Sequence, residues 1–266
     1  MAPTDPQPAA EAPLRGRGIL VTRPAGQSER LVRLIAAAGG TPIVFPAIEI
    51  RAVADARQAR DRIAHLRDYD VVVFVSANAV EHGLALMPPG ESLPASAIVA
   101  AVGAGTARAL TARGVSRVLL PADRYDSESL LAMPPLTEVA GKRVLVVRGV
   151  GGRELLADTL VARGAQVDYA ECYERMPPSA STAPLLDAWR ADALHAVTIT
   201  SSEGLRHLHG VLPEEGRARL RATTIFVTHP RMRETASTLG LHDVVIAEAG
   251  DEGLCAALVA HYAARA

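Results

Sequence analysis

The 266-residue chain is long enough for two globular domains, and its hydrophobic residues, 49% of the total, can fill a core in each. Its formal net charge of -1 gives no general attraction to nucleic acid or to an anionic membrane, and no apolar stretch reaches the roughly 20 residues that a membrane-spanning helix needs. Two cysteines, Cys172 and Cys255, are too few and too far apart to indicate a disulfide framework or a zinc site.

The first 17 residues are rich in proline and alanine and contain no apolar segment typical of an export signal. We therefore expect residues 1–17 to form a disordered tail. With neither an export signal nor a membrane span, the protein is expected to be soluble and cytoplasmic, with no membrane or nucleic-acid partner.

The segment that follows the tail has a counterpart later in the chain, so the sequence contains an internal repeat. Gly18–Ile50 reads as an apolar strand, an arginine, a glycine-containing turn, a helix that ends at a glycine, and a second strand. Arg143–Arg175 has the same order, with a helix expected from Glu154 to Arg163. Corresponding residues are each 125 positions apart: Arg23 and Arg148, Gly26 and Gly151, Glu29 and Glu154, and Gly39 and Gly164. The common spacing indicates one structural module present twice.

Apolar runs rich in valine and isoleucine recur along the chain, as expected for parallel strands that are covered by helices on both faces. The predicted strands are Ile19–Thr22, Ile43–Phe45, Val71–Val75, Ile98–Val102, Val118–Leu120, Val144–Val147, Val167–Tyr169, Val197–Thr200, Thr224–Val227 and Val244–Ala247. Further predicted helices are Gly105–Arg113, Asp126–Met133, Glu203–His209 and Glu252–Tyr262. This alternation predicts an α/β fold with two five-stranded parallel sheets.

Two domain arrangements fit the repeat. A tandem arrangement places one domain at about residues 18–135 and the other at 141–262. In a crossed arrangement, the long strands Phe45–Arg51 and Tyr169–Met176 pass between lobes, so that each lobe combines one module with the later strands of the other half. The periodicity is compatible with both.

Residues that could bind an anion cluster where the predicted strands end. Small residues before a helix expose backbone N–H groups at the positive end of the helix dipole, although serine, threonine and asparagine there are also ordinary N-caps. The candidates are Arg23, Ser76, Ala77, Asn78, Gly103, Ala104, Gly105, Thr106, Arg148, Gly149, Gly151, Gly152, Arg153, Ser201, Ser202, Thr228, His229 and Arg231. Together they predict a cleft between two lobes that takes up an acidic small molecule.

Cofactor and metal motifs are incomplete. Ala101–Leu110 contains Gly103 and Gly105, but Arg108 stands where a dinucleotide fingerprint needs its third small residue. His207 and His209 are two positions apart on a predicted helix and therefore face different sides. We expect no metal site and no cofactor.

An ordered set of segments resembles the uroporphyrinogen-III synthase family over about Gly18–Tyr262. The segments are LVTRPAGQ (Leu20–Gln27), VVFVSANAVEHGL (Val72–Leu84), AVGAGTARAL (Ala101–Leu110), RVLVVRGVGGRELL followed by a strand ending in CYER (Arg143–Arg175), and VTITSSEGL (Val197–Leu205).

The resemblance implies two flavodoxin-like lobes in the crossed arrangement, each a parallel five-stranded sheet with helices on both faces. One lobe would comprise residues 18–45 and 178–264 and the other 51–170, with 46–50 and 171–177 as a two-stranded linker. It also implies a monomer that acts without a cofactor on hydroxymethylbilane, handed over from hydroxymethylbilane synthase. The reaction removes water, closes the macrocycle and inverts the last pyrrole ring through a spiro intermediate.

The resemblance implies a proton donor at Tyr173, whose alternative role is that of an ordinary linker tyrosine. Arg23 and Arg148 are expected either to bind a substrate carboxylate or to bridge to an acidic side chain such as Glu29 or Glu154. The segment after the third strand of the second half departs from its counterpart, because His229 and Arg231 replace small residues there. A non-catalytic two-lobed binding or sensor protein and a nucleotide-dependent oxidoreductase are the competing functions.

Overall fold

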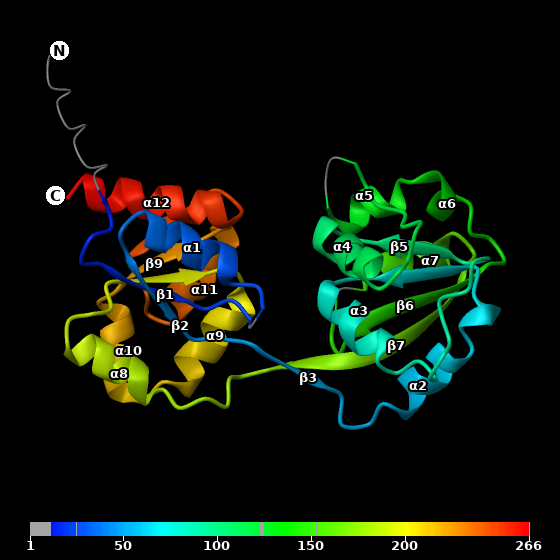
Figure 1. Ribbon diagram of the computed structural model, residues 1–266, viewed down its shortest axis with the longest axis horizontal. Coiled ribbons are helices and arrows are strands. Elements are labelled where there is room, and N and C mark those ends of the chain that lie inside the picture. Colours follow the sequence, from blue (N-terminus) through cyan, green and yellow to red (C-terminus); the bar gives the residue numbers. More distant parts are fainter. Residues whose placement is uncertain (1–11, 25, 123–124, 153, 266) are drawn as a thin grey trace, which may run out of the picture. The chain divides into compact units, whose positions relative to one another are not determined.

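The computed structural model describes residues 12–24, 26–122, 125–152 and 154–265. They form two compact units: unit 1 contains the chain up to Glu49 and from Met176 onward, and unit 2 contains Ile50–Arg175. Each unit is built on a five-stranded sheet with helices packed against it (Figure 1).

The sheet of unit 1 has the strand order β10-β9-β8-β1-β2, and its neighbouring strands are all parallel. The strands are β1 (Gly18–Val21), β2 (Thr41–Val44), β8 (Ala196–Ile199), β9 (Thr224–Val227) and β10 (Val244–Ile246). The helices are α1 (Glu29–Ala37), α8 (Ala183–Arg190), α9 (Ser202–Val211), α10 (Glu214–Arg221), α11 (Pro230–Thr238) and α12 (Asp251–Ala263).

Helices cover both faces of this sheet. Successive side chains of a strand point to opposite faces, so Ile19 and Val21 are buried in a cluster with residues of α1 and α12. Leu20 is buried in the other cluster, to which α8, α9, α10 and α11 contribute. Figure 1 shows α1 and α12 together on one side of β1. Burial on both faces explains why these strands read as uninterrupted apolar runs.

Part of the expected tail is folded. Leu14 is fully buried, and its backbone N–H donates to the carbonyl of Ala38 at 2.9 Å. The guanidinium of Arg17 lies 4.8 Å from the centre of the Tyr262 ring. The prediction of disorder is therefore wrong for residues 12–17, because an apolar side chain completes the core there; residues 1–11 lie outside the described residues.

The sheet of unit 2 has the strand order β3-β7-β6-β4-β5, and the pairs from β7 to β5 are parallel. The strands are β3 (Glu49–Ala52), β4 (Val71–Phe74), β5 (Ile98–Ala101), β6 (Arg143–Gly149) and β7 (Gln166–Met176). The helices are α2 (Arg57–Ala64), the 3-10 helix η1 (Leu66–Asp68), α3 (Ala77–Leu84), α4 (Ala104–Ala112), α5 (Ser127–Leu131), α6 (Pro134–Thr137) and α7 (Leu155–Ala162). Residues of α2, α3 and α4 share one core cluster, and those of α5, α6 and α7 share the other.

The fifth strand of unit 2 is not the predicted one. Val118–Leu120 makes only an isolated bridge, in which Leu119 pairs with Ala100. Pro121 follows at once and has no N–H with which to extend the ladder. The fifth position is taken instead by β3, beside β7.

Each of the two repeated modules forms a sheet with strands from the other half of the chain. β1 and β2 come from the first module, yet β1 pairs with β8 from the second half of the chain. β6 and β7 come from the second module, and β6 pairs with β4 from the first half. Each sheet therefore combines a module from one half with strands from the other.

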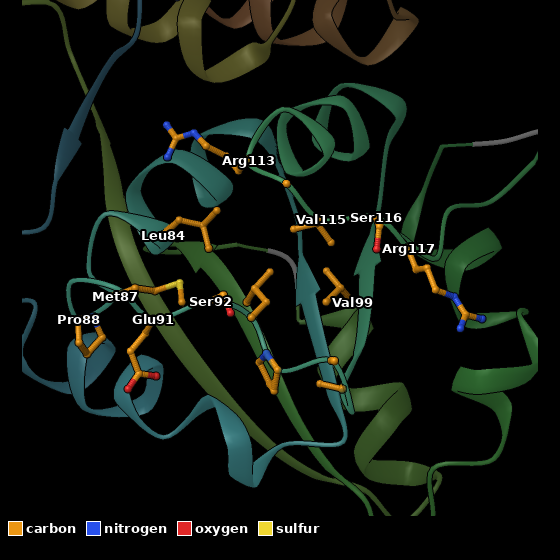
Figure 2. A pocket seen from close by; sticks show the side chains of 15 residues that line it. Leu84, Met87, Pro88, Glu91, Ser92, Val99, Arg113, Val115, Ser116 and Arg117 are labelled. Carbon is orange, nitrogen blue, oxygen red and sulfur yellow. The ribbon is translucent and has the colours of Figure 1, made fainter.

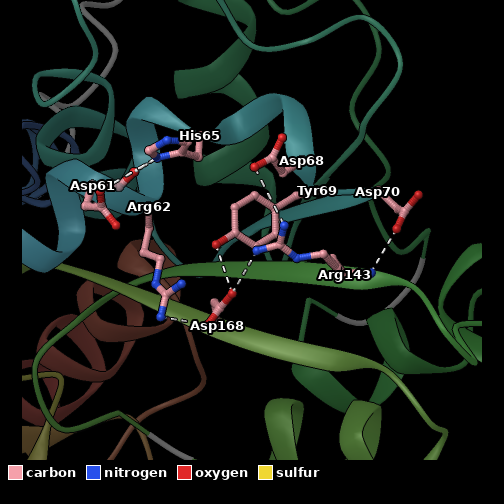
Figure 3. Close-up of polar contacts among 8 residues, drawn as sticks. All are labelled: Asp61, Arg62, His65, Asp68, Tyr69, Asp70, Arg143 and Asp168. Carbon is pink, nitrogen blue, oxygen red and sulfur yellow. Dashed lines mark hydrogen bonds and ion pairs between the residues drawn. The ribbon is translucent and has the colours of Figure 1, made fainter.

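A polar network ties together the amino ends of β4, β6 and β7 (Figure 3). Asp168 accepts a hydrogen bond from the Tyr69 hydroxyl at 2.9 Å and pairs with the guanidinium groups of Arg62 at 3.1 Å and Arg143 at 3.6 Å. Burial, and then the bond to Asp168, raise the pKa of Tyr69, so this hydroxyl stays a proton donor. The network lies at the edge of the sheet opposite to the strand carboxyl ends.

Asp168→Asn is expected to lower the free energy of unfolding by about 2 kcal/mol. The substitution removes the negative charge with which the partly buried guanidinium groups of Arg62 and Arg143 both form ion pairs. Urea denaturation measures the change. The matched control is Asp61→Asn: Asp61 pairs only with His65 among the described residues, its side chain is 69% exposed, and a change within about 0.5 kcal/mol is expected. Equal effects of both substitutions would contradict the role given to Asp168.

Candidate functional site

Parallel strands end at the same edge of a sheet, so the predicted site residues gather at one edge of each unit. In unit 1 they are Arg23, Ser201, Ser202, Thr228, His229 and Arg231. In unit 2 they are Ser76, Ala77, Asn78, Gly103, Ala104, Gly105, Thr106, Arg148, Gly149, Gly151, Gly152 and Tyr173. Arg153 lies outside the described residues.

Three of these side chains cap helices. The Ser76 hydroxyl accepts from the Ala79 N–H at 3.0 Å at the start of α3, and the Ser201 hydroxyl accepts from the Gly204 N–H at 3.0 Å at the start of α9. The His229 ring accepts from the Arg231 N–H at 3.2 Å at the start of α11. Capping therefore occupies one acceptor of each side chain, while the hydroxyls of Ser76 and Ser201 keep a proton to donate.

The two arginines at equivalent positions are both paired with carboxylates. Arg23 lies 2.9 Å from Asp251 at the start of α12, and not against Glu29. Arg148 is 7% exposed and bridges Glu154 at 2.9 Å and Glu171 at 3.1 Å. The bridging role predicted as one alternative is thus the arrangement in the structure.

Tyr169 completes the surroundings of Arg148. Its ring centre lies 4.1 Å from the guanidinium carbon of Arg148, and its hydroxyl donates to Glu154. The bond to Arg148 holds the pKa of Glu154 below its usual range, and burial raises the pKa of Tyr169 to about 12. The Tyr169 phenol therefore keeps its proton at neutral pH while it donates to Glu154, whose lowered pKa keeps it a carboxylate.

Tyr173 lies in an enclosed position behind the ends of β4 and β6. Its side chain is fully buried, its hydroxyl lies 3.0 Å from the Ser76 hydroxyl, and the Arg175 guanidinium donates to it at 3.0 Å. The His82 ring stacks on it with 5.7 Å between ring centres. Arginine can only donate, so the Tyr173 proton points away from Arg175, toward Ser76.

The ring of Tyr173 leaves no space for a side chain at Gly149. A Cβ atom on Gly149 would lie 2.6 Å from two atoms of the Tyr173 ring, closer than any ordinary contact. The absence of a side chain at the end of β6 thus gives the ring its place.

A cavity of about 300 Å³ opens at this edge of unit 2. It is lined by Val75, Val102, Tyr125, Asp126, Ser127, Val146, Arg148, Gly149, Gly152, Leu156, Ala157, Tyr169 and Arg175. Its polar side chains come from β6 (Arg148), from β7 (Tyr169 and Arg175) and from the segment at the start of α5 (Tyr125, Asp126 and Ser127), whereas α7 contributes only Leu156 and Ala157. An apolar cavity with a few convergent polar groups is typical of a ligand site.

A larger cavity, of about 650 Å³, lies at the opposite edge of the same sheet, among the segments that follow α3 and α4 (Figure 2). Its walls include Leu84, Met87 and Val115, and the side chains of Arg113 and Arg117 point in different directions at its margin. None of the predicted site residues that the structure describes lines it. The smaller cavity is therefore the stronger candidate.

Several residues of the smaller cavity were not predicted, among them Tyr125, Tyr169 and Arg175. Arg175 could have been found, because residues two apart on a strand share a face and Tyr173 was already a candidate. Tyr125 could not, because the predicted strand before it, Val118–Leu120, is not a strand of the sheet, and only the fold brings Tyr125 to the cavity.

The described residues contain no group of three or more histidine, cysteine, aspartate or glutamate side chains placed to hold a metal ion. Burial raises the pKa of the Cys172 thiol to about 12, so this neighbour of Tyr173 is not a nucleophile at neutral pH.

Among the residues that the structure describes, no helix is both long and apolar enough to cross a bilayer.

Comparison with known proteins gives one consistent result. The family model described as uroporphyrinogen-III synthase HemD matches residues 29–256. The uroporphyrinogen-III synthase of Salmonella typhimurium is 36% identical over 235 residues, which are 88% of this chain and 96% of that protein. The Escherichia coli enzyme gives the same identity and coverage.

Solved structures share the fold. A mutant uroporphyrinogen III synthase from Thermus thermophilus has a TM-score of 0.56 at 20% identity, covering 94% of this chain and 98% of its own. The uroporphyrinogen-III synthetase from Helicobacter pylori has a TM-score of 0.58 at 16% identity, covering 92% of this chain and 98% of its own.

Proposed function

The chain belongs to the uroporphyrinogen-III synthase family, and we propose that the edge of unit 2 around Tyr173 and the 300 Å³ cavity takes part in its reaction. The protein is an enzyme of tetrapyrrole biosynthesis, a lyase. The observation that carries the proposal is the convergence of Ser76, Tyr173 and Arg175 beside that cavity, at the carboxyl ends of parallel strands.

The proposed substrate is linear hydroxymethylbilane, which carries acetate and propionate groups on its four rings. The enzyme removes water, closes the macrocycle with inversion of the last ring through a spiro intermediate, and releases uroporphyrinogen III. The free substrate can close without inversion, so the enzyme must hold one conformation in which the new bond forms at the correct carbon. The same lability favours handover from hydroxymethylbilane synthase.

Each unit is proposed to be a flavodoxin-like lobe, with lobe 1 at residues 18–45 and 178–264 and lobe 2 at 51–170. The order β2-β1-β8-β9-β10 supports this for unit 1, because it is the 2-1-3-4-5 order of that fold once the strands are numbered along the chain. In unit 2 the four strands β7-β6-β4-β5 follow the same order, but β3 lies beside β7 and not beside β5. Residues 46–50 and 171–177 would then be the two linker strands.

Tyr173 is proposed to supply the proton that the leaving hydroxyl takes up. Its own hydroxyl is fully buried, whereas Ser76 is partly exposed and lies 3.0 Å away. Since the Tyr173 proton is directed toward Ser76, the serine hydroxyl can pass a proton on to a bound substrate while it receives one from the phenol. The hydroxyl leaves as water, the substrate is left as a cation and Tyr173 as a phenolate beside the Arg175 guanidinium, while Ser76 stays neutral. The proton that the pyrrole ring loses after the new bond has formed restores the phenol.

Analysis of the products tests the function directly. Purified protein and freshly generated hydroxymethylbilane should give the type III isomer of the porphyrin after oxidation. A product that is type I alone, as in the absence of protein, would contradict synthase activity and favour a binding protein.

Tyr173→Phe is expected to lower kcat by about tenfold to a hundredfold without abolishing turnover, because positioning of the substrate is retained. The matched control is Tyr69→Phe, a buried hydroxyl lost at the other edge of the same sheet; it should lower stability but leave kcat unchanged. Unchanged kcat in Tyr173→Phe would remove the phenol from the reaction, and complete loss in a folded variant would make it essential.

A further inference from the structure

Arg175 stands at the end of β7 with its guanidinium directed to the site. One nitrogen donates to the Tyr173 hydroxyl at 3.0 Å, and the guanidinium carbon lies 5.3 Å from the centre of the Tyr173 ring. The residue also lines the 300 Å³ cavity. It therefore touches both the proposed proton donor and the space beside it.

Arg175 and Arg148, the two arginines that line this cavity, differ in their ion-pair partners. Arg148 already forms ion pairs with two carboxyl groups, those of Glu154 and Glu171. Among the residues that the structure describes, no carboxylate forms an ion pair with Arg175. A guanidinium has five N–H donors, and the bond to Tyr173 uses one of them.

We propose that Arg175 binds a carboxylate of the substrate in this cavity and at the same time fixes the hydroxyl of Tyr173. The inference rests on the proposed function and assigns a specificity-determining and positioning residue to it. A guanidinium presents parallel N–H groups that match a carboxylate, and a substrate carboxylate would give Arg175 the ion-pair partner that it does not have among the described residues. Substrate binding and orientation of the proton donor would then depend on the same side chain.

The size of the cavity defines what enters it. About 300 Å³ is at the lower limit of ligand pockets, so it suits one pyrrole ring with its acidic substituents and not a whole bilane. Gly149 and Gly152 keep the wall free of side chains, and Leu156 with Ala157 gives it an apolar surface. A flat ring with a carboxylate reaching Arg175 is the ligand that this lining fits.

The test compares Arg175→Gln, Arg175→Lys and the control Arg113→Gln, which makes the same charge change on an exposed side chain at the opposite edge of unit 2. KM and kcat for hydroxymethylbilane are measured at low and high salt, with thermal unfolding as the check on folding. Arg175→Gln should raise KM about tenfold or more and weaken its dependence on salt. Arg175→Lys should recover part of KM, because it keeps the charge but not the paired donors.

Two outcomes would overturn the proposal. The first is a KM for Arg175→Gln within twofold of the wild type, equal to that of Arg113→Gln. The second is a fall in kcat with KM and its salt dependence unchanged, which would leave Arg175 as a partner of Tyr173 only. Wild-type protein that yields only the type I isomer contradicts the proposed function itself, and isomer analysis of the same samples separates that failure from the other two.

Discussion

Gly149→Ala is expected to abolish most of the activity and to lower the free energy of unfolding by about 1–3 kcal/mol. The added methyl would lie 2.6 Å from the Tyr173 ring, which is fully buried and stacked on His82. The ring must move, and movement breaks the contacts of its hydroxyl with Ser76 and Arg175. Steady-state kinetics and urea denaturation measure the two losses.

A double-mutant cycle identifies the cause. If the clash is responsible, Gly149→Ala combined with Tyr173→Leu should be less destabilising than the sum of the two single changes, by about 1 kcal/mol or more. The control for stability is Gly152→Ala, whose methyl would meet its nearest neighbours at an ordinary 3.7 Å. Additive effects in the cycle would show that Gly149 is needed for some other reason.

Gly18→Ala is expected to have the largest effect on folding, a loss of more than about 3 kcal/mol. A Cβ atom on Gly18 would lie 1.7 Å from the carbonyl oxygen of Ala193. That contact is with backbone, and no rotamer change relieves it. The two segments are also tied together, because the Gly18 N–H donates to the His195 ring at 3.0 Å and the His195 N–H donates to the Gly18 carbonyl at 2.8 Å.

Chemical denaturation measures this effect, with Gly210→Ala as the matched control. Gly210 lies on α9 with nothing within 4 Å of its added methyl, so alanine should leave stability unchanged or raise it by up to about 1 kcal/mol. A Gly18→Ala variant with the denaturation midpoint of the wild type would contradict the close approach of β1 to Ala193.

The sequence was sufficient to predict nine of the ten described strands and the helices α1, α4, α5, α7, α9 and α12, whereas it did not single out α2, α3, α6, α8, α10 or α11. Burial on both faces makes strands such as β4 and β8 continuous apolar runs, and a glycine ends α7, so local patterns determined these elements. Local patterns could not decide whether Val118–Leu120 or β3 forms the fifth strand of the sheet in unit 2. Both segments are short, and only the partner strand decides which of them forms a ladder.

The positions of several candidate site residues on their strands and helices could also be predicted from local patterns. The repeat correctly placed Arg23 and Arg148 at strand ends, and the serines Ser76 and Ser201 at helix starts. It did not indicate that Arg23 pairs with Asp251, because that carboxylate comes from α12, far along the chain. Contacts made by distant segments depend on the packed fold and leave no signal in local spacing. The family, in contrast, was correctly identified from the order of several weak motifs.

The exchange of modules between the sheets has a consequence for biosynthesis. A ribosome releases β1 and β2 first, but the strand that lies beside β1 in the finished sheet, β8, begins only at Ala196. Unit 2 ends at Arg175 and can complete its core earlier in translation. During that interval the nascent β1 has one unpaired edge, and the emerging chain must keep this edge from pairing with another molecule.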